Sequence, residues 1–105
     1  MTTKVYNKLV RDKIPEIIEA EGKTLKTRIL NNEEYLQALI IKLGEEFDEF
    51  KQDSNIEELA DLQEVILALA DALNIKHSDL AKALSEKTLK RGAFKKRIFL
   101  ESVEE

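Results

Sequence analysis

The stretch "GEEFDEFKQDSNIEELADLQEV", residues 44–65, reads as the end of one helix, a polar turn and the start of a second helix. Apolar residues recur at helical spacing on both sides of the break "QDSN". The pattern predicts a first long helix over about 32–51 and a second over about 55–74. Because the turn between them is short, the two helices should lie antiparallel.

Capping residues support both helix starts. Asn31 followed three positions later by Glu34 resembles a capping box, in which the two residues satisfy each other's free backbone N–H groups. Ser54 with Glu57 has the same spacing and predicts the start of the second helix. The sequence therefore predicts a helical hairpin closed by the residues around position 54.

The remaining segments complete a mostly helical chain. Pro15 suits the start of a short helix and Gly22 suits its end. A third long helix is expected over about 78–90, with Gly92 as its stop. Residues 24–30 and 96–100 contain β-branched residues and are candidates for a small two-stranded β element.

Composition favours one helical domain over the whole chain, residues 1–105. The chain has 105 residues, 3 glycines and 1 proline, which argues against disorder and against a turn-rich all-β fold. It has no cysteine, which excludes a disulfide scaffold, a thiolate zinc site and a cysteine nucleophile. The fold class predicted is all-α.

Composition, charge and hydropathy indicate the cellular location and the kinds of partner expected for the protein. The lack of cysteine fits a reducing cytoplasm, and the N-terminus has no signal-peptide pattern, so we expect a cytoplasmic protein. No apolar run approaches the ~18–20 residues of a membrane span. With a formal net charge of −4, no general attraction to a nucleic acid polymer is expected.

The acidic residues of the hairpin are placed to meet. Glu49 and Glu58 lie equally far from the middle of the turn, as do Glu46 and Asp61, so antiparallel packing brings each pair together. Within each helix the acids are spaced i,i+3 and share a face. Helical spacing puts Glu46 at the edge of the apolar face of the first helix and Glu58 inside the apolar face of the second. These carboxylates should therefore point towards the seam between the helices.

Two interpretations of this cluster remain. An acidic run is commonly a solvated charged face. At a seam, however, neighbouring like charges and desolvation both disfavour ionised carboxylates. No base lies within the apolar face of either helix, and Lys51 lies near the turn. A divalent cation would compensate the charge, and all-oxygen ligands suit Mg²⁺, with Mn²⁺ also possible.

Three motifs resemble one family. "EEFDE" at 45–49 followed by "ELAD" at 58–61 resembles the EExxE…ExxD signature of the MazG-like, all-α nucleoside triphosphate pyrophosphohydrolases, the superfamily of phosphoribosyl-ATP pyrophosphohydrolase. "YNKLVRDKIPEII" at 6–18 resembles the opening of a MazG-like subgroup, and "KTLKRGAFKKRI" at 87–98 resembles its basic closing segment. The resemblance touches the start, the middle and the end of the chain.

The resemblance implies an activity and a site. It implies hydrolysis of a nucleoside triphosphate to a monophosphate and pyrophosphate, as housecleaning of non-canonical or surplus nucleotides. Carried over by position, the magnesium ligands fall on Glu46, Glu49, Glu58 and Asp61. Glu45 would be an additional ligand or a base acting through water. Eight residues separate Glu49 from Glu58, fewer than in typical MazG domains. The resemblance therefore does not identify the substrate.

The resemblance also implies an assembly. It implies a homodimer or a dimer of dimers, in which two hairpins form a four-helix bundle. A lone hairpin with a charged seam cannot cover the apolar faces of both its helices, which supports the same expectation.

Basic residues at both ends of the chain are candidate phosphate ligands. Near the C-terminus they share one helical face, where the alternative is that they only complement the helix dipole: Lys87, Lys90 and Arg91. Near the N-terminus they lie in an irregular stretch, where binding residues often sit, and the resemblance favours function over a plain surface loop: Lys8, Arg11 and Lys13.

Two other functions stay open. The short connection between the acidic motifs could spoil catalysis and leave a helical module that binds metal, nucleotide or protein without turnover. Within the enzyme class, the chain could hydrolyse phosphoribosyl-ATP, although "YNKLVRDKIP" disfavours that reading.

Overall fold

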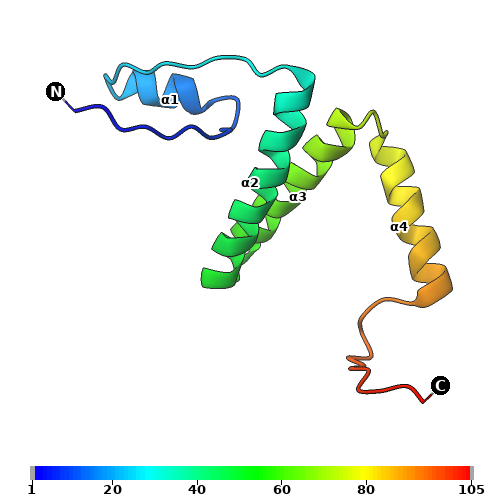
Figure 1. The fold of residues 1–105 in the computed structure, drawn as a ribbon. Coiled ribbons are helices and arrows are strands. Elements are labelled where there is room, and N and C mark those ends of the chain that lie inside the picture. Colours follow the sequence, from blue (N-terminus) through cyan, green and yellow to red (C-terminus); the bar gives the residue numbers. More distant parts are fainter. Residues whose placement is uncertain (1, 105) are drawn as a thin grey trace.

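The computed structural model describes residues 2–104, which form four helices and no strand (Figure 1). The helices are α1 (Ile14–Ala20), α2 (Asn32–Gln52), α3 (Ile56–Ala72) and α4 (His77–Arg91). The predicted all-α class is confirmed. The two predicted strands, at 24–30 and 96–100, are wrong, because both segments are irregular. β-branched residues favour a strand only where another strand packs beside them.

Helices α2 and α3 lie side by side and run antiparallel, as the turn predicts (Figure 1). The capping box at the start of α2 is confirmed. The side chain of Asn31 accepts a hydrogen bond from the Glu34 backbone N–H at 2.9 Å, and the Glu34 side chain accepts one from the Asn31 N–H at 3.3 Å. The start of α2 is thus fixed by local chemistry alone.

The cap of α3 differs from the prediction by one residue. Asn55, and not Ser54, accepts the hydrogen bond from a first-turn backbone N–H, that of Glu58, at 2.9 Å. The Ser54 hydroxyl instead donates to the Phe50 carbonyl at 2.8 Å and so belongs to the end of α2. Asparagine caps a helix as well as serine does, so the sequence offered two neighbouring caps of similar strength.

The end of α4 is as predicted, while its packing is sparse. Gly92 follows the helix with a φ of 82°, a conformation that only glycine adopts without strain. His77, the first residue of α4, lies 2.9 Å from a carboxylate oxygen of Asp71. Within residues 2–104, α4 packs against α3 only, and α1 packs against no other helix.

The core of a single chain is small. Leu39, Val65 and Ala70 are the buried apolar residues of the described chain, and all three belong to the α2/α3 hairpin. The radius of gyration is 18.6 Å, against about 13 Å for a compact domain of this length. Much apolar surface that a folded protein would bury therefore stays accessible.

Part of this surface is a regular stripe. On α3, Leu59, Ile66 and Leu73 are exposed at seven-residue spacing, which places them on one face. On α2, Ile40 and Phe47 are exposed with the same spacing. At 100° per residue, Phe47 points away from the flank of α2 that carries Glu49. We call these five residues the apolar stripe, and it occupies the side of the hairpin opposite the carboxylates.

No helix among residues 2–104 combines the length and the apolar character needed to cross a bilayer.

Candidate functional site

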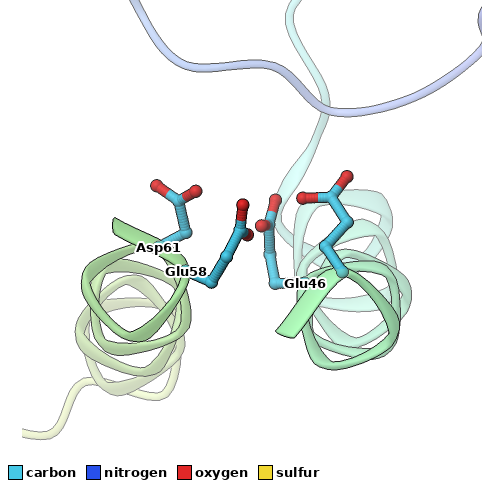
Figure 2. A group of neighbouring side chains, drawn as sticks. Glu46, Glu58 and Asp61 are labelled. Carbon is cyan, nitrogen blue, oxygen red and sulfur yellow. The ribbon is translucent and has the colours of Figure 1, made fainter. Parts of the chain in front are cut away.

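Four carboxylates converge where α2 passes α3. Glu46 and Glu49 of α2, together with Glu58 and Asp61 of α3, each offer an oxygen atom, and these atoms all lie within 4.8 Å of one another. Figure 2 shows Glu46 and Glu58 facing each other across the seam, with Asp61 next to Glu58 on α3 and its carboxylate pointing to the same side. The predicted convergence is confirmed. The facing pair differs from the pairs expected from equal distance to the turn.

The four carboxylates, which we call the quartet, range from buried to exposed. Glu46 is only 6% exposed, Glu58 and Asp61 are half-buried, and Glu49 is exposed. One carboxylate oxygen of Glu46 and one of Glu58, both Oε2, are buried without a hydrogen-bond partner. A buried carboxylate oxygen without a partner is costly, so these two atoms mark a place where a cation would fit.

A lysine reaches the quartet, although the sequence predicted no compensating base within the apolar face of either helix. Lys42 Nζ lies 3.3 Å from Glu46 Oε1 and 3.6 Å from Glu45 Oε2, and its side chain is only 19% exposed. Its spacing from these acids, i,i+4 and i,i+3, is the signal that could have revealed it. The long aliphatic stem of Lys42 lets the residue lie against apolar surface while its amine reaches the carboxylates.

The quartet raises the pKa of its two inner members. Burial raises the pKa of Glu46, and the neighbouring Glu49 adds to the rise, while Lys42 opposes it. Desolvation raises the pKa of Glu58, and the charges of Asp61 and Glu46 add to it. Lys42 therefore offsets only part of the effect of burial and like charge on the pKa of Glu46.

These shifts predict a pH dependence of stability in the absence of divalent cations. The folded protein holds protons on Glu46 and Glu58 above the ordinary glutamate pKa of about 4.3. Their contribution to the free energy of unfolding is full below that pH and is lost as pH rises through the raised values. Urea unfolding in the presence of chelator should show this fall.

The control is the double variant Glu46→Gln/Glu58→Gln, which keeps the side-chain shape and removes both titrations. The free energy of unfolding of the unchanged protein should decline relative to that of the variant as pH rises above the ordinary glutamate pKa of about 4.3. A difference between the two proteins that does not change with pH would contradict the clustering of these carboxylates.

The N-terminal segment crosses the side of the quartet towards which the carboxylates point (Figure 2). Arg11 pairs with Asp61, with 2.5 Å between Nη2 and Oδ1. Lys8 helps to line a small cavity, about 50 Å³, between this segment and the Lys42 side of α2. Lys13 precedes α1 and is exposed. Of the three predicted N-terminal bases, the structure thus brings Arg11 into contact with the quartet.

The three C-terminal bases lie elsewhere in the chain. They are exposed residues in the last two turns of α4, which stands apart from α2 (Figure 1): Lys87, Lys90 and Arg91. Since α4 packs only against α3 within the described residues, these bases do not reach the quartet of their own chain. Their role in phosphate binding stays a prediction.

Neither of two cavities in the described chain encloses a nucleotide at the quartet. The 50 Å³ cavity borders Glu45 and Lys42, and it is far below the ~300–1,000 Å³ of a typical small-molecule site. Another cavity, of about 290 Å³, is lined by residues of α1 and the segment after it, and by none of the quartet. The site of one chain is therefore an open acidic surface.

The donor set fits a hard cation. All four groups are carboxylates, the ligands preferred by Mg²⁺, Ca²⁺ and Mn²⁺, and two of their oxygens are buried without a partner. Fold and site together define an all-helical protein with a candidate carboxylate cation centre. The residues alone do not select the metal.

Comparisons with known proteins add one partial relative. A stretch of 43 residues is 51% identical to a protein of Mycolicibacterium smegmatis (strain ATCC 700084 / mc(2)155) described as uncharacterized. The match covers 41% of this chain and 44% of that protein. No family model matches the sequence, and no solved structure matches it.

Proposed function

We propose that this protein is a metal-dependent nucleoside triphosphate pyrophosphohydrolase of the MazG-like class. The observation that carries the proposal is the quartet, in which Glu46 is buried and has an oxygen without a partner. Its spacing matches the acidic signature that the sequence resembles. The reaction is NTP + H₂O → NMP + PPi, and the substrates are non-canonical or surplus nucleotides.

The quartet holds Mg²⁺, or Mn²⁺ in its place, between α2 and α3. Bound there, the ion supplies neutralisation of phosphate charge and activation of the attacking water. Glu45, half-buried beside Lys42, is an additional ligand or a base acting through water. Lys42 offsets part of the charge of Glu46, so that the metal-free protein tolerates the cluster.

The phosphates of the substrate require cations from outside the quartet. Lys8 lines the small cavity beside Lys42 and Glu45, and Lys13 lies directly before α1. The bases of α4 can reach a quartet only from a second copy of the chain, because within one chain they lie too far along α4. Positioned cations of this kind stabilise the charge that develops on phosphoryl oxygens.

The proposed functional unit is therefore a homodimer or a dimer of dimers. The apolar stripe of each hairpin packs against that of another copy and forms a four-helix bundle core. This arrangement supplies the apolar burial that a single chain lacks, and it turns the open acidic surface into a cleft between copies.

A non-catalytic role is the second candidate. The cavity that borders Glu45 and Lys42 is only about 50 Å³, and the connection between α2 and α3 is short. A helical module that binds a divalent cation and a nucleotide without turnover would need no enclosed site. Hydrolysis of phosphoribosyl-ATP is the remaining alternative within the enzyme class.

Phosphorus NMR separates these functions. The protein is incubated with Mg²⁺ and a mixture of canonical and damaged nucleoside triphosphates, and phosphoribosyl-ATP is tested separately. We expect growth of pyrophosphate and monophosphate signals, which EDTA abolishes. Release of orthophosphate and diphosphate would contradict the proposed cleavage site. Metal-dependent binding of nucleotide without any product would instead support the non-catalytic module.

A further inference from the structure

Arg11 is the polar link between the N-terminal segment and the hairpin. Its guanidinium pairs with Asp61, a residue fifty positions along the chain. Every other side-chain hydrogen bond or ion pair recorded among residues 2–104 joins residues at most six positions apart. The Arg11–Asp61 contact therefore joins distant parts of the chain, whereas the other polar contacts are local.

The geometry of this contact leaves half of the Asp61 carboxylate free. Arg11 donates through Nη2 to Oδ1, and within the described chain no hydrogen bond to Oδ2 is recorded. The pair formed by Arg28 and Glu34 is different, since Nη1 and Nη2 bind both oxygens of the glutamate, at 3.3 and 3.0 Å. One carboxylate is thus fully occupied by its arginine, while the other keeps an oxygen available for a metal.

The charges around the quartet also favour an arginine that stays in place. The quartet and the adjoining Glu45 carry five negative charges when ionised, and Lys42 and Arg11 offset two of them. The remaining negative charge exceeds that of one divalent cation. Expelling Arg11 would leave the cluster still more negative after the cation binds, at a cost set by like-charge repulsion.

We propose that Arg11 is a positioning residue for the cation centre. It holds Asp61 Oδ1 so that Oδ2 meets the ion, and it remains bonded when the ion binds. Because Arg11 belongs to the N-terminal segment, cation binding also fixes that segment across the site. This inference rests on the proposed metal site and adds a residue that the acidic signature does not contain.

The first test is the affinity of the full-length protein for Mn²⁺, measured by titration calorimetry. Groups that hydrogen-bond a metal ligand typically contribute about 10–100-fold to metal affinity. We expect Arg11→Met to weaken Mn²⁺ binding by about that factor and Arg11→Lys to restore part of it. The matched control Arg28→Met removes a comparable exposed arginine–carboxylate pair away from the quartet and should leave the affinity unchanged.

The second test follows the segment itself. Bound Mn²⁺ broadens the NMR signals of nearby nuclei, so the backbone amides of residues 9–13 should broaden together with that of Asp61. Joint broadening shows that the segment lies over the bound ion, and the change in Mn²⁺ affinity of Arg11→Met, partly restored in Arg11→Lys, shows that Arg11 acts on the ion. In Arg11→Met the broadening of residues 9–13 should weaken, while that of the quartet returns once Mn²⁺ is raised to saturation.

The outcomes distinguish the two proposals. Unchanged or tighter Mn²⁺ binding by Arg11→Met would overturn the positioning role, because an arginine that must leave would compete with the metal. If the unchanged protein binds Mn²⁺ but Arg11→Met behaves identically, the metal site stands and only this inference fails. If the unchanged protein binds no Mn²⁺ at all, both proposals fail.

Discussion

Replacement of Glu58 by glutamine is expected to slow nucleotide hydrolysis by more than about 100-fold while leaving the fold intact. Glutamine keeps the shape of the side chain and one carbonyl oxygen, but it removes the charge that a cation needs. Glu58 is the inner acid of α3, faces Glu46 across the seam and has a buried oxygen without a partner (Figure 2). Steady-state release of pyrophosphate measures the effect.

The stability of this variant makes the test specific. The pKa of Glu58 is raised, so folding disfavours its charged form relative to the neutral form, which the glutamine amide imitates. Without divalent cations, Glu58→Gln should therefore be at least as resistant to urea as the unchanged protein near neutral pH. Loss of activity combined with unchanged or improved stability excludes misfolding as the cause.

The neighbouring residue provides the matched control. Glu57 precedes Glu58 on α3, is exposed and lies outside the quartet. Glu57→Gln makes the same chemical change and should retain activity. Glu49→Gln tests the exposed end of the quartet and should also reduce turnover. If Glu58→Gln and Glu49→Gln fold normally and hydrolyse nucleotides as well as the parent, the enzymatic proposal is lost.

Replacement of Ile66 by glutamate is expected to break the proposed assembly. Ile66 is the middle residue of the apolar stripe on α3 and is 44% exposed in the single chain. Burying an isoleucine side chain stabilises by about 1.5–3 kcal/mol, and a two-fold interface loses this contribution twice. Since Ile66 is already more than half buried in the single chain, the dissociation constant of the dimer should rise by about one to two orders of magnitude from lost burial. Sedimentation velocity over a range of protein concentrations measures this shift.

The control for this substitution is Ala60→Glu. Ala60 is exposed on α3, at helical spacing from the acidic residues Glu57, Glu64 and Asp71. It therefore receives the same added charge on the polar face of the helix and should leave the assembly intact. A protein that sediments as a folded monomer before any substitution would contradict the proposed assembly. Equal loss of assembly in both variants would show that the apolar stripe is not the interface.

Those features of the site that depend on near neighbours in the chain could be predicted from the sequence. The convergence of Glu46, Glu49, Glu58 and Asp61 followed from two helical periodicities and one short turn, all encoded within about twenty residues. The inner position of Glu46 and Glu58 followed from their place relative to the apolar faces of the two helices. These features were correct because a helix fixes the relative directions of its side chains.

The errors share another cause. No base was expected within the apolar faces of the two helices, yet the flexible four-carbon stem of Lys42 lets its amine reach Glu45 and Glu46. Ser54 was the predicted cap of α3, but its hydroxyl bonds to the end of α2. The neighbouring Asn55, which caps a helix equally well, takes that role instead. Periodicity carries no information about such choices.

The sequence by itself determined the helical hairpin, the limits of its helices to within a few residues, and the facing of its carboxylates, because these depend on interactions between near neighbours in the chain. Only the tertiary structure decided that Arg11 reaches Asp61, that the C-terminal bases of α4 stay away from the quartet, and that apolar residues remain exposed opposite it. Those outcomes depend on the path of the chain between distant segments, which local spacing does not fix.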